Sequence, residues 1–250
     1  MARTQKHKIA LFLASNLAAG AFFYAPHANA QSALLSPTGG KGQLVFDNLT
    51  GLRANVTQGV SYSGFIGFQI ERYSQNVDLG GNVSGNAVIH ATTVWFAPQA
   101  DYFVINHLSI GGLVEIASTS GSEDIPVNAA QTQSTDLATT TDVTLMPRVG
   151  WMFALGDRFG IWPRGGLGYA LRQSSDPGGN GKDSFSGVVI NATCPFLYRI
   201  NETFFVDLSP DLTWIPGSTS TTNNANQTVS QSASYLQFGA SGGLGVMLDL

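Results

Sequence analysis

The chain has few charged residues and a single cysteine. Only 11% of its 250 residues are Asp, Glu, Lys or Arg, which is low for a secreted domain that must keep a charged surface in water. Cys194 has no second cysteine to pair with, so an intramolecular disulfide framework is excluded. A protein with so little charge and no disulfide must hide its apolar side chains in some other way.

Basic residues are a minority of the charged ones, with 12 Lys and Arg against 16 Asp and Glu. This balance argues against nucleic acid as a partner. No cluster of Cys, His and carboxylate residues has the spacing of metal ligands, so we expect no metal site. We also expect no cofactor.

Long hydrophobic runs are missing after residue 30, which excludes a transmembrane helix there. Residues 1–30 instead have the three parts of a cleavable signal peptide. A basic start with Arg3, Lys6 and Lys8 precedes an apolar stretch, and Ala28 and Ala30 form a small-x-small cleavage site. We therefore expect cleavage after Ala30 and export of the rest of the chain.

Beyond the signal peptide, apolar and polar residues alternate in eight segments that are longer than most globular strands. The segments lie at about 59–73, 89–104, 107–119, 140–156, 158–173, 183–199, 203–217 and 232–250. The connections at 105–107, 156–157 and 200–202 are short, whereas the other four are long and polar. Short turns at one end and long loops at the other are typical of bacterial outer-membrane barrels.

The two faces of these segments differ in a way that favours the barrel. In the last segment Leu236, Phe238 and Leu244 share one face, and Gln237 and Gly239 lie on the other. A secreted β-sandwich would place charged residues on its solvent face, whereas small polar residues suit the cramped lumen of an eight-stranded barrel. We predict an all-β fold, an eight-stranded antiparallel up-and-down transmembrane β-barrel over residues 57–250. Residues 31–56, which contain "GQLVFDN", could be a short extra strand, a lumenal segment or a periplasmic tail.

Three sets of residues are candidates for a structural or functional role. Charges on the polar face are expected to pair inside the lumen, because an unpaired buried charge is costly. This expected lumenal network comprises Asp101, Glu115, Arg148, Arg164, Asp207 and Asp211, with Gln99 nearby. An aromatic belt is expected beside the short, periplasmic turns, formed by Tyr102, Phe103, Trp151, Phe153, Phe159, Phe196, Tyr198 and Phe204. Missing ladder bonds are expected at four lipid-facing prolines, Pro98, Pro147, Pro163 and Pro210.

Catalytic chemistry has weak support in the sequence. A nucleophile and a base must lie within reach of each other, and after the signal peptide only His90 and His107 could act as an imidazole base. His90 falls at the outer end of its segment, where lipid A chemistry would take place, and His107 falls in a short turn. Cys194 alternates with apolar residues and is expected to face lipid. We therefore expect no enzyme activity, and the variant His90→Ala should leave the lipid A profile unchanged.

The stretch "APQADYFVINHLSIGGLVEI" resembles the strand–turn–strand unit of the bacterial outer-membrane β-barrel domain family, the small barrels related to OmpX, OmpA and the opacity-type proteins. "MPRVGWMFALGDRFGIWPRGGLGY" repeats the unit, and "FLYRINETFFVDLSPDL" does so loosely. The resemblance covers about residues 59–250 and implies an eight-stranded outer-membrane barrel. That family shares an architecture and no single activity, so the resemblance implies no active site. Its members commonly end in an aromatic residue, whereas this chain ends in Leu250.

The sequence thus predicts a monomeric outer-membrane protein of a Gram-negative bacterium with a structural or surface-interaction role and a lumen plugged by side chains. Its expected partners are outer-membrane lipid, including lipopolysaccharide, and the outer-membrane assembly machinery. The ligand of the exposed loops is not identified by any residue. The alternatives are a narrow channel for ions or small solutes and a lipid A-modifying enzyme.

Overall fold

The computed structural model describes residues 38–55, 59–78, 84–128, 131–175, 177, 181–222 and 227–250. All of them belong to one compact unit, Ser36–Leu250. The expected signal peptide at residues 1–30 lies outside the described residues. The described part of the chain has no helix long and apolar enough to cross a membrane.

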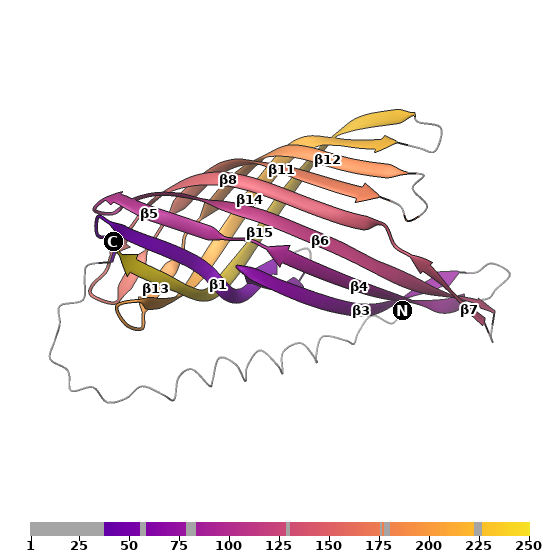
Figure 1. Cartoon of the computed structure of the whole chain (residues 1–250), viewed down its shortest axis with the longest axis horizontal. Helices are drawn as coiled ribbons and strands as arrows, with labels where there is room; N and C mark the ends of the chain where they lie inside the picture. The colour runs from indigo at the N-terminus through magenta and orange to yellow at the C-terminus, as the bar shows by residue number, and fades with distance from the viewer. Residues whose placement is uncertain are drawn as a thin grey trace. The chain divides into compact units, whose positions relative to one another are not determined.

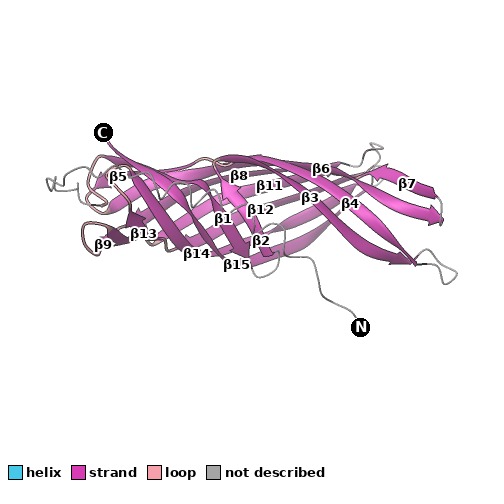
Figure 2. Ribbon diagram, turned by 90° about the horizontal axis from the view of Figure 1, so that it is seen from below, coloured by secondary structure: helices cyan, strands magenta, loops and turns pink. Residues whose placement is uncertain are grey.

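Fifteen strands form one antiparallel sheet (Figures 1 and 2). They are β1 (Gln43–Asn55), β2 (Gly59–Gly64), β3 (Ile66–Asp78), β4 (Ser84–Phe96), β5 (Gln99–Ile105), β6 (Leu108–Asn128), β7 (Gln131–Asp136), β8 (Thr139–Trp151), β9 (Phe153–Ala154), β10 (Phe159–Ile161), β11 (Arg164–Ser175), β12 (Lys182–Thr193), β13 (Phe196–Arg199), β14 (Phe204–Thr222) and β15 (Thr228–Asp249).

Eight of these strands form a ring of pairings. The order is β1, β5, β6, β8, β11, β12, β14 and β15. The ring returns to its start at Phe46 of β1, which lies opposite Ala100 of β5 on one side and Val246 of β15 on the other. The other strands extend these eight above or below that level.

The first strand of the ring differs from the one that the sequence predicts. Residues 59–73 are not one strand, because β2 pairs with β1 and β3 pairs with β4, and the chain reverses between them at Phe65. The place in the ring is taken by β1, which has a register shift between Phe46 and Thr50 around Asn48, a residue with φ +56°. An asparagine adopts this left-handed conformation more readily than most residues, which permits the bulge. The other seven expected segments correspond to strands of the sheet.

Prolines lie at several of the interruptions between strands. β4 is separated from β5 by Ala97 and Pro98, and β10 from β11 by Trp162 and Pro163. A further break at Pro195, between β12 and β13, is one that the sequence reasoning passed over. Because proline has no amide hydrogen to donate, each such position loses a bond of the ladder.

Pro147 and Pro210 lie inside continuous strands, but the pairing beside them still has gaps. The β8–β11 pairs pass from Arg148–Gly166 to Leu145–Tyr169 and so skip Pro147. Beside Pro210, the pairs with β14 pass from Thr193–Asp211 to Phe196–Leu208.

The short turns and the C-terminus lie at one end of the sheet, which we call the turn end (Figure 1). The backbone amide of Leu250 there donates to the carbonyl of Gly42, 3.2 Å away. At the opposite end the strands run far beyond the ring, and β6, β14 and β15 have 21, 19 and 22 residues. Segments that the sequence marks as long polar loops thus include long strand extensions.

In the extended part, β3 and β15 each have an edge without a partner strand among the described residues. β3 pairs with β4 alone, and the part of β15 before Gly239 pairs with β14 alone. Below that point β15 pairs with β1 from Thr50 to Asn55, and β2 (Gly59–Gly64) pairs with the same part of β1.

The sheet carries its apolar residues on the outside of the ring. Leu145, Leu167 and Leu208 are each about 60% exposed, at 59%, 62% and 61%. The residues that alternate with them face inward, and they include buried charged groups such as Arg148 and Arg164. This distribution is the reverse of that in a water-soluble domain, whose charged groups lie on the surface.

Candidate functional site

Four charged side chains meet inside the ring, and we call them the buried charge cluster. They are Asp47 on β1, Asp101 on β5, Arg148 on β8 and Arg164 on β11. Each is buried, with at most 8% of its surface exposed. Two carboxylates and two guanidiniums balance in charge, which a desolvated site requires.

Each arginine bridges both carboxylates of the cluster. Arg148 donates through Nε to Asp101 Oδ2 at 2.8 Å and through Nη2 to Asp47 Oδ1 at 2.8 Å, and a further bond joins its Nη2 to Asp101. Its Nη1 donates to Gln99 Oε1 at 2.7 Å. Arg164 Nη1 donates to Asp47 Oδ2 and lies 3.4 Å from Asp101 Oδ2. This network joins strands that are far apart in the sequence and links β1 across the ring to β8 and β11.

The sequence around Arg164 makes room for this arrangement. The guanidinium lies over the ring of Trp162, with Cζ 4.4 Å from its centroid, and Trp162 Nε1 donates to Ser109 Oγ at 3.1 Å. A Cβ at Gly150 would come within 2.6–2.8 Å of Trp162, Arg164 and Ser109. Glycine at this position is therefore required by close packing.

An apolar cluster lies on the turn-end side of these charges, and we call it the apolar plug. It consists of Val45, Phe103, Met152, Trp162, Leu197, Phe205 and Met247, each at most 3% exposed. Phe103 and Trp162 stack with their centroids 5.4 Å apart. The seven residues come from widely separated parts of the chain and fill the interior at this level.

Residues 38–42 cover the plug from the turn end. The Gly39 carbonyl accepts from the His107 amide at 2.7 Å, and the Gly42 amide donates to the Phe103 carbonyl at 2.9 Å. Thr38 is 2% exposed and accepts from Arg199 Nη1 at 3.5 Å. A charged layer, an apolar layer and this covering segment thus follow one another inside the ring toward the turn end.

Comparison with known proteins identifies the architecture. No protein-family model and no curated protein sequence matches the chain. A solved structure does match: the crystal structure of the outer membrane protein OprG from Pseudomonas aeruginosa, with a TM-score of 0.50 over 86% of this chain and 100% of that one. The all-β antiparallel sheet with its ring of eight strands is thus similar in fold to this outer-membrane protein. Because only 10% of the residues are identical, the likeness to OprG is one of fold alone.

The expected lumenal network is brought together only in part. Asp101, Arg148 and Arg164 form the buried charge cluster with Gln99. Asp207 accepts from the Gly243 amide at 3.0 Å and interacts electrostatically with Asp47 and Arg164, and Asp211 accepts from Asn191 Nδ2 at 3.5 Å. Glu115 interacts electrostatically with Arg172, which also donates to Asp142 at 2.6 Å.

Sequence reasoning missed Asp47, which completes the cluster. It lies in the segment 31–56, for which the sequence offered three placements, and the structure puts Gln43–Asn55 in β1. The alternation in "QLVFDNL" is the signal that could have found it, because Asp47 has the same parity as Gln43 and Val45, which are also buried.

The expected aromatic belt contains one residue that points the other way. Phe103 is fully buried in the apolar plug, so its expected place on the exterior is wrong. Neighbouring residues of a strand face opposite sides, so Tyr102 and Phe103 cannot both lie outside. The other seven members are exposed close to the turn end, namely Tyr102, Trp151, Phe153, Phe159, Phe196, Tyr198 and Phe204.

The two histidines and the cysteine lie apart from one another. His90 lies on β4, with Nε2 3.5 Å from Asp124 Oδ2 on β6. His107 is in the turn after β5 with φ +73°, and Cys194 lies between β12 and β13. Within the described residues no group of three or more His, Cys, Asp and Glu could hold a metal ion.

Proposed function

We propose that this chain is an outer-membrane protein of a Gram-negative bacterium, exported through a signal peptide, whose ring of strands is a closed transmembrane β-barrel. Its role is structural or one of surface interaction, with the lumen plugged by side chains and the long strand extensions outside the cell. The observation that carries the proposal is the inverted packing: charges are buried inside the ring, while Leu, Ile, Val and Phe cover its exterior. In lipid this arrangement is favourable, because the apolar residues need no cover.

The lack of hydrogen-bonding partners in a lipid bilayer also supports closure of the sheet at the edge of β3. Backbone amides and carbonyls that face hydrocarbon must be hydrogen-bonded within the protein, and each one left unpaired costs several kcal/mol. The apolar part of β3, from Ile66 to Ile70, lies on the exterior. In the membrane we therefore expect the backbone groups of this edge to be largely paired, while the outward side chains of β3 still face the lipid.

The first test is the electrophoretic mobility of the protein in outer-membrane fractions. A folded membrane barrel resists denaturation by the gel detergent, so the unboiled sample should migrate differently from the boiled one. The protein should also be absent from the periplasmic fraction. The variant Leu208→Arg places a charge on the exterior and should cost roughly 2–4 kcal/mol of stability if it lies near the bilayer midplane. The control Thr221→Arg, on the extension, should have little effect. A soluble protein without a mobility shift would refute the proposal.

The plugged lumen makes a separate prediction about conductance. Reconstituted into a planar lipid bilayer, the protein should give no steady single-channel current, because the buried charge cluster and the apolar plug obstruct the ring. A steady current that changes in the variant Arg148→Ala would overturn the plug and favour the narrow channel instead.

A further inference from the structure

The exterior of the sheet changes from apolar to polar at one level of nearly every long strand. On β3 the outward residues Ile66, Phe68 and Ile70 are followed by Arg72. On the other strands the first polar residues that follow are Thr92 on β4, Ser118 on β6, Thr141 on β8, Gln173 on β11, Ser186 on β12, Ser218 on β14 and Ser234 on β15. Under the proposed function this level is the outer boundary of the hydrocarbon layer.

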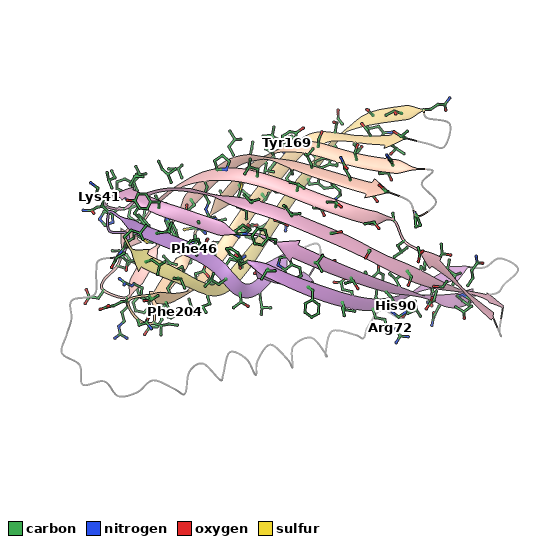
Figure 3. The ribbon with its side chains drawn as sticks, in the orientation of Figure 1. Lys41, Phe46, Arg72, His90, Tyr169 and Phe204 are labelled. Carbon is green, nitrogen blue, oxygen red and sulfur yellow. The ribbon has the colours of Figure 1, made fainter. Side chains whose placement is uncertain are left out.

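Arg72 is the only Lys or Arg among these first polar residues. On β11, Arg172 precedes Gln173 but has the inward parity of Arg164 and pairs with Asp142. His90 lies directly opposite Arg72 on β4, and Ser122 of β6 lies opposite His90. Asp124 is close to His90, at 3.5 Å, so the guanidinium of Arg72 is the strongest positive group of this row. Figure 3 shows Arg72 and His90 together toward the end of β3 and β4, far from Lys41 and Phe204 at the turn end.

The outward apolar side chains that precede Arg72 on β3 are highly exposed. Ile66, Phe68 and Ile70 are 73%, 70% and 72% exposed, more than the other large apolar side chains that the structure describes within the wall. The cause is the position of β3 at an edge, since it pairs with β4 and has no second neighbouring strand among the described residues. A strip of apolar surface therefore runs along β3 and ends at a cation.

This strip fits one kind of molecule, an amphiphile whose acyl chain runs along an apolar surface and whose phosphate meets a guanidinium. Arginine binds phosphate through two parallel hydrogen bonds, which makes such a contact geometrically specific. The other first polar residues of this row, as far as the structure describes them, are Ser, Thr and Gln, which carry no charge. The positive charge of Arg72 and the exposed apolar side chains thus lie together on β3.

We propose that β3 carries a binding site for one molecule of the outer-leaflet phosphorylated glycolipid, lipid A or lipopolysaccharide, with Arg72 holding a phosphate and Ile66, Phe68 and Ile70 holding an acyl chain. The site rests on the proposed membrane location and specifies which part of the exterior recognises lipid. His90 lies beside the headgroup position.

The test is native mass spectrometry of the detergent-purified protein titrated with lipid A. The wild-type protein should retain one lipid A, and Arg72→Gln should weaken its binding about fivefold, as expected for the loss of one cation at a lipid surface. Lipid A without phosphates should bind wild type and variant equally weakly. Phosphatidylglycerol tests the alternative that any anionic lipid is accepted; equal retention of it would overturn the glycolipid assignment.

Arg158→Gln is the matched control, because Arg158 is an exposed arginine in the turn between β9 and β10, at the other end of the wall. It should bind lipid A like the wild type. Unchanged binding in Arg72→Gln, or an equal loss in Arg158→Gln, would overturn the site. The heat-dependent mobility shift of the same samples separates the two proposals: if it is present while Arg72 has no effect, only the glycolipid site fails, and without it both fail.

Discussion

The variant Asp47→Asn should lower the free energy of unfolding by about 3–5 kcal/mol, because it leaves a buried guanidinium without its full complement of negative charge. Asp47 accepts from both Arg148 and Arg164, and its side chain is 4% exposed. Loss of its charge removes one of the two carboxylates with which each arginine pairs, and Asp101 keeps its pairs with both. The measurement is urea unfolding in lipid vesicles, followed by tryptophan fluorescence.

A double variant shows whether charge balance is the cause. Asp47→Asn combined with Arg164→Met restores one carboxylate to one guanidinium, and it should recover part of the stability that Asp47→Asn loses. Asp142→Asn is the matched control, since its partner Arg172 has a side chain 56% exposed, and a pair in contact with water contributes roughly 1 kcal/mol or less. Equal losses in Asp47→Asn and Asp142→Asn would contradict a desolvated cluster.

Much of the architecture follows from period-2 alternation and turn length. Those two signals predict seven of the eight strands of the ring, because the outward face of each must be apolar and a short turn leaves little freedom of register. They fail at residues 59–73, where alternation continues through two strands that run in opposite directions. Alternation records which face a residue occupies, and it carries no information on the direction of the chain.

The buried charge cluster was predictable in part for a similar reason. Arg148 and Arg164 lie on neighbouring strands with inward parity, so the need for carboxylates on both sides was evident from the sequence. The identity of those carboxylates depends on stagger around the ring. It brings Asp47 and Asp101 into direct contact with the arginines, while Asp207 interacts electrostatically with Arg164 beside its bond to Gly243, and Glu115 interacts with Arg172. Stagger is a property of the assembled ring and not of any one strand.

Trp162→Ala should destabilise the protein by about 3–5 kcal/mol, the range for removal of a large buried aromatic side chain. Trp162 is 0% exposed, stacks on Phe103 and supports Arg164, so truncation opens a cavity between the apolar plug and the buried charge cluster. It also leaves Ser109 Oγ without its donor. Trp162→Phe keeps most of the ring contact and should lose less.

The matched control for this variant is Trp214→Ala, because Trp214 lies on the exterior of β14 and is 46% exposed. Both variants remove one of four tryptophans and leave three fluorescence reporters. In a membrane barrel the interior is the packed side, so Trp162→Ala should be much the more damaging of the two. A soluble sandwich with its core on the other face of the sheet would give the opposite order, since Trp214 would then lie in the core. The pair of variants therefore identifies which face of the sheet is packed, independently of where the protein is found in the cell.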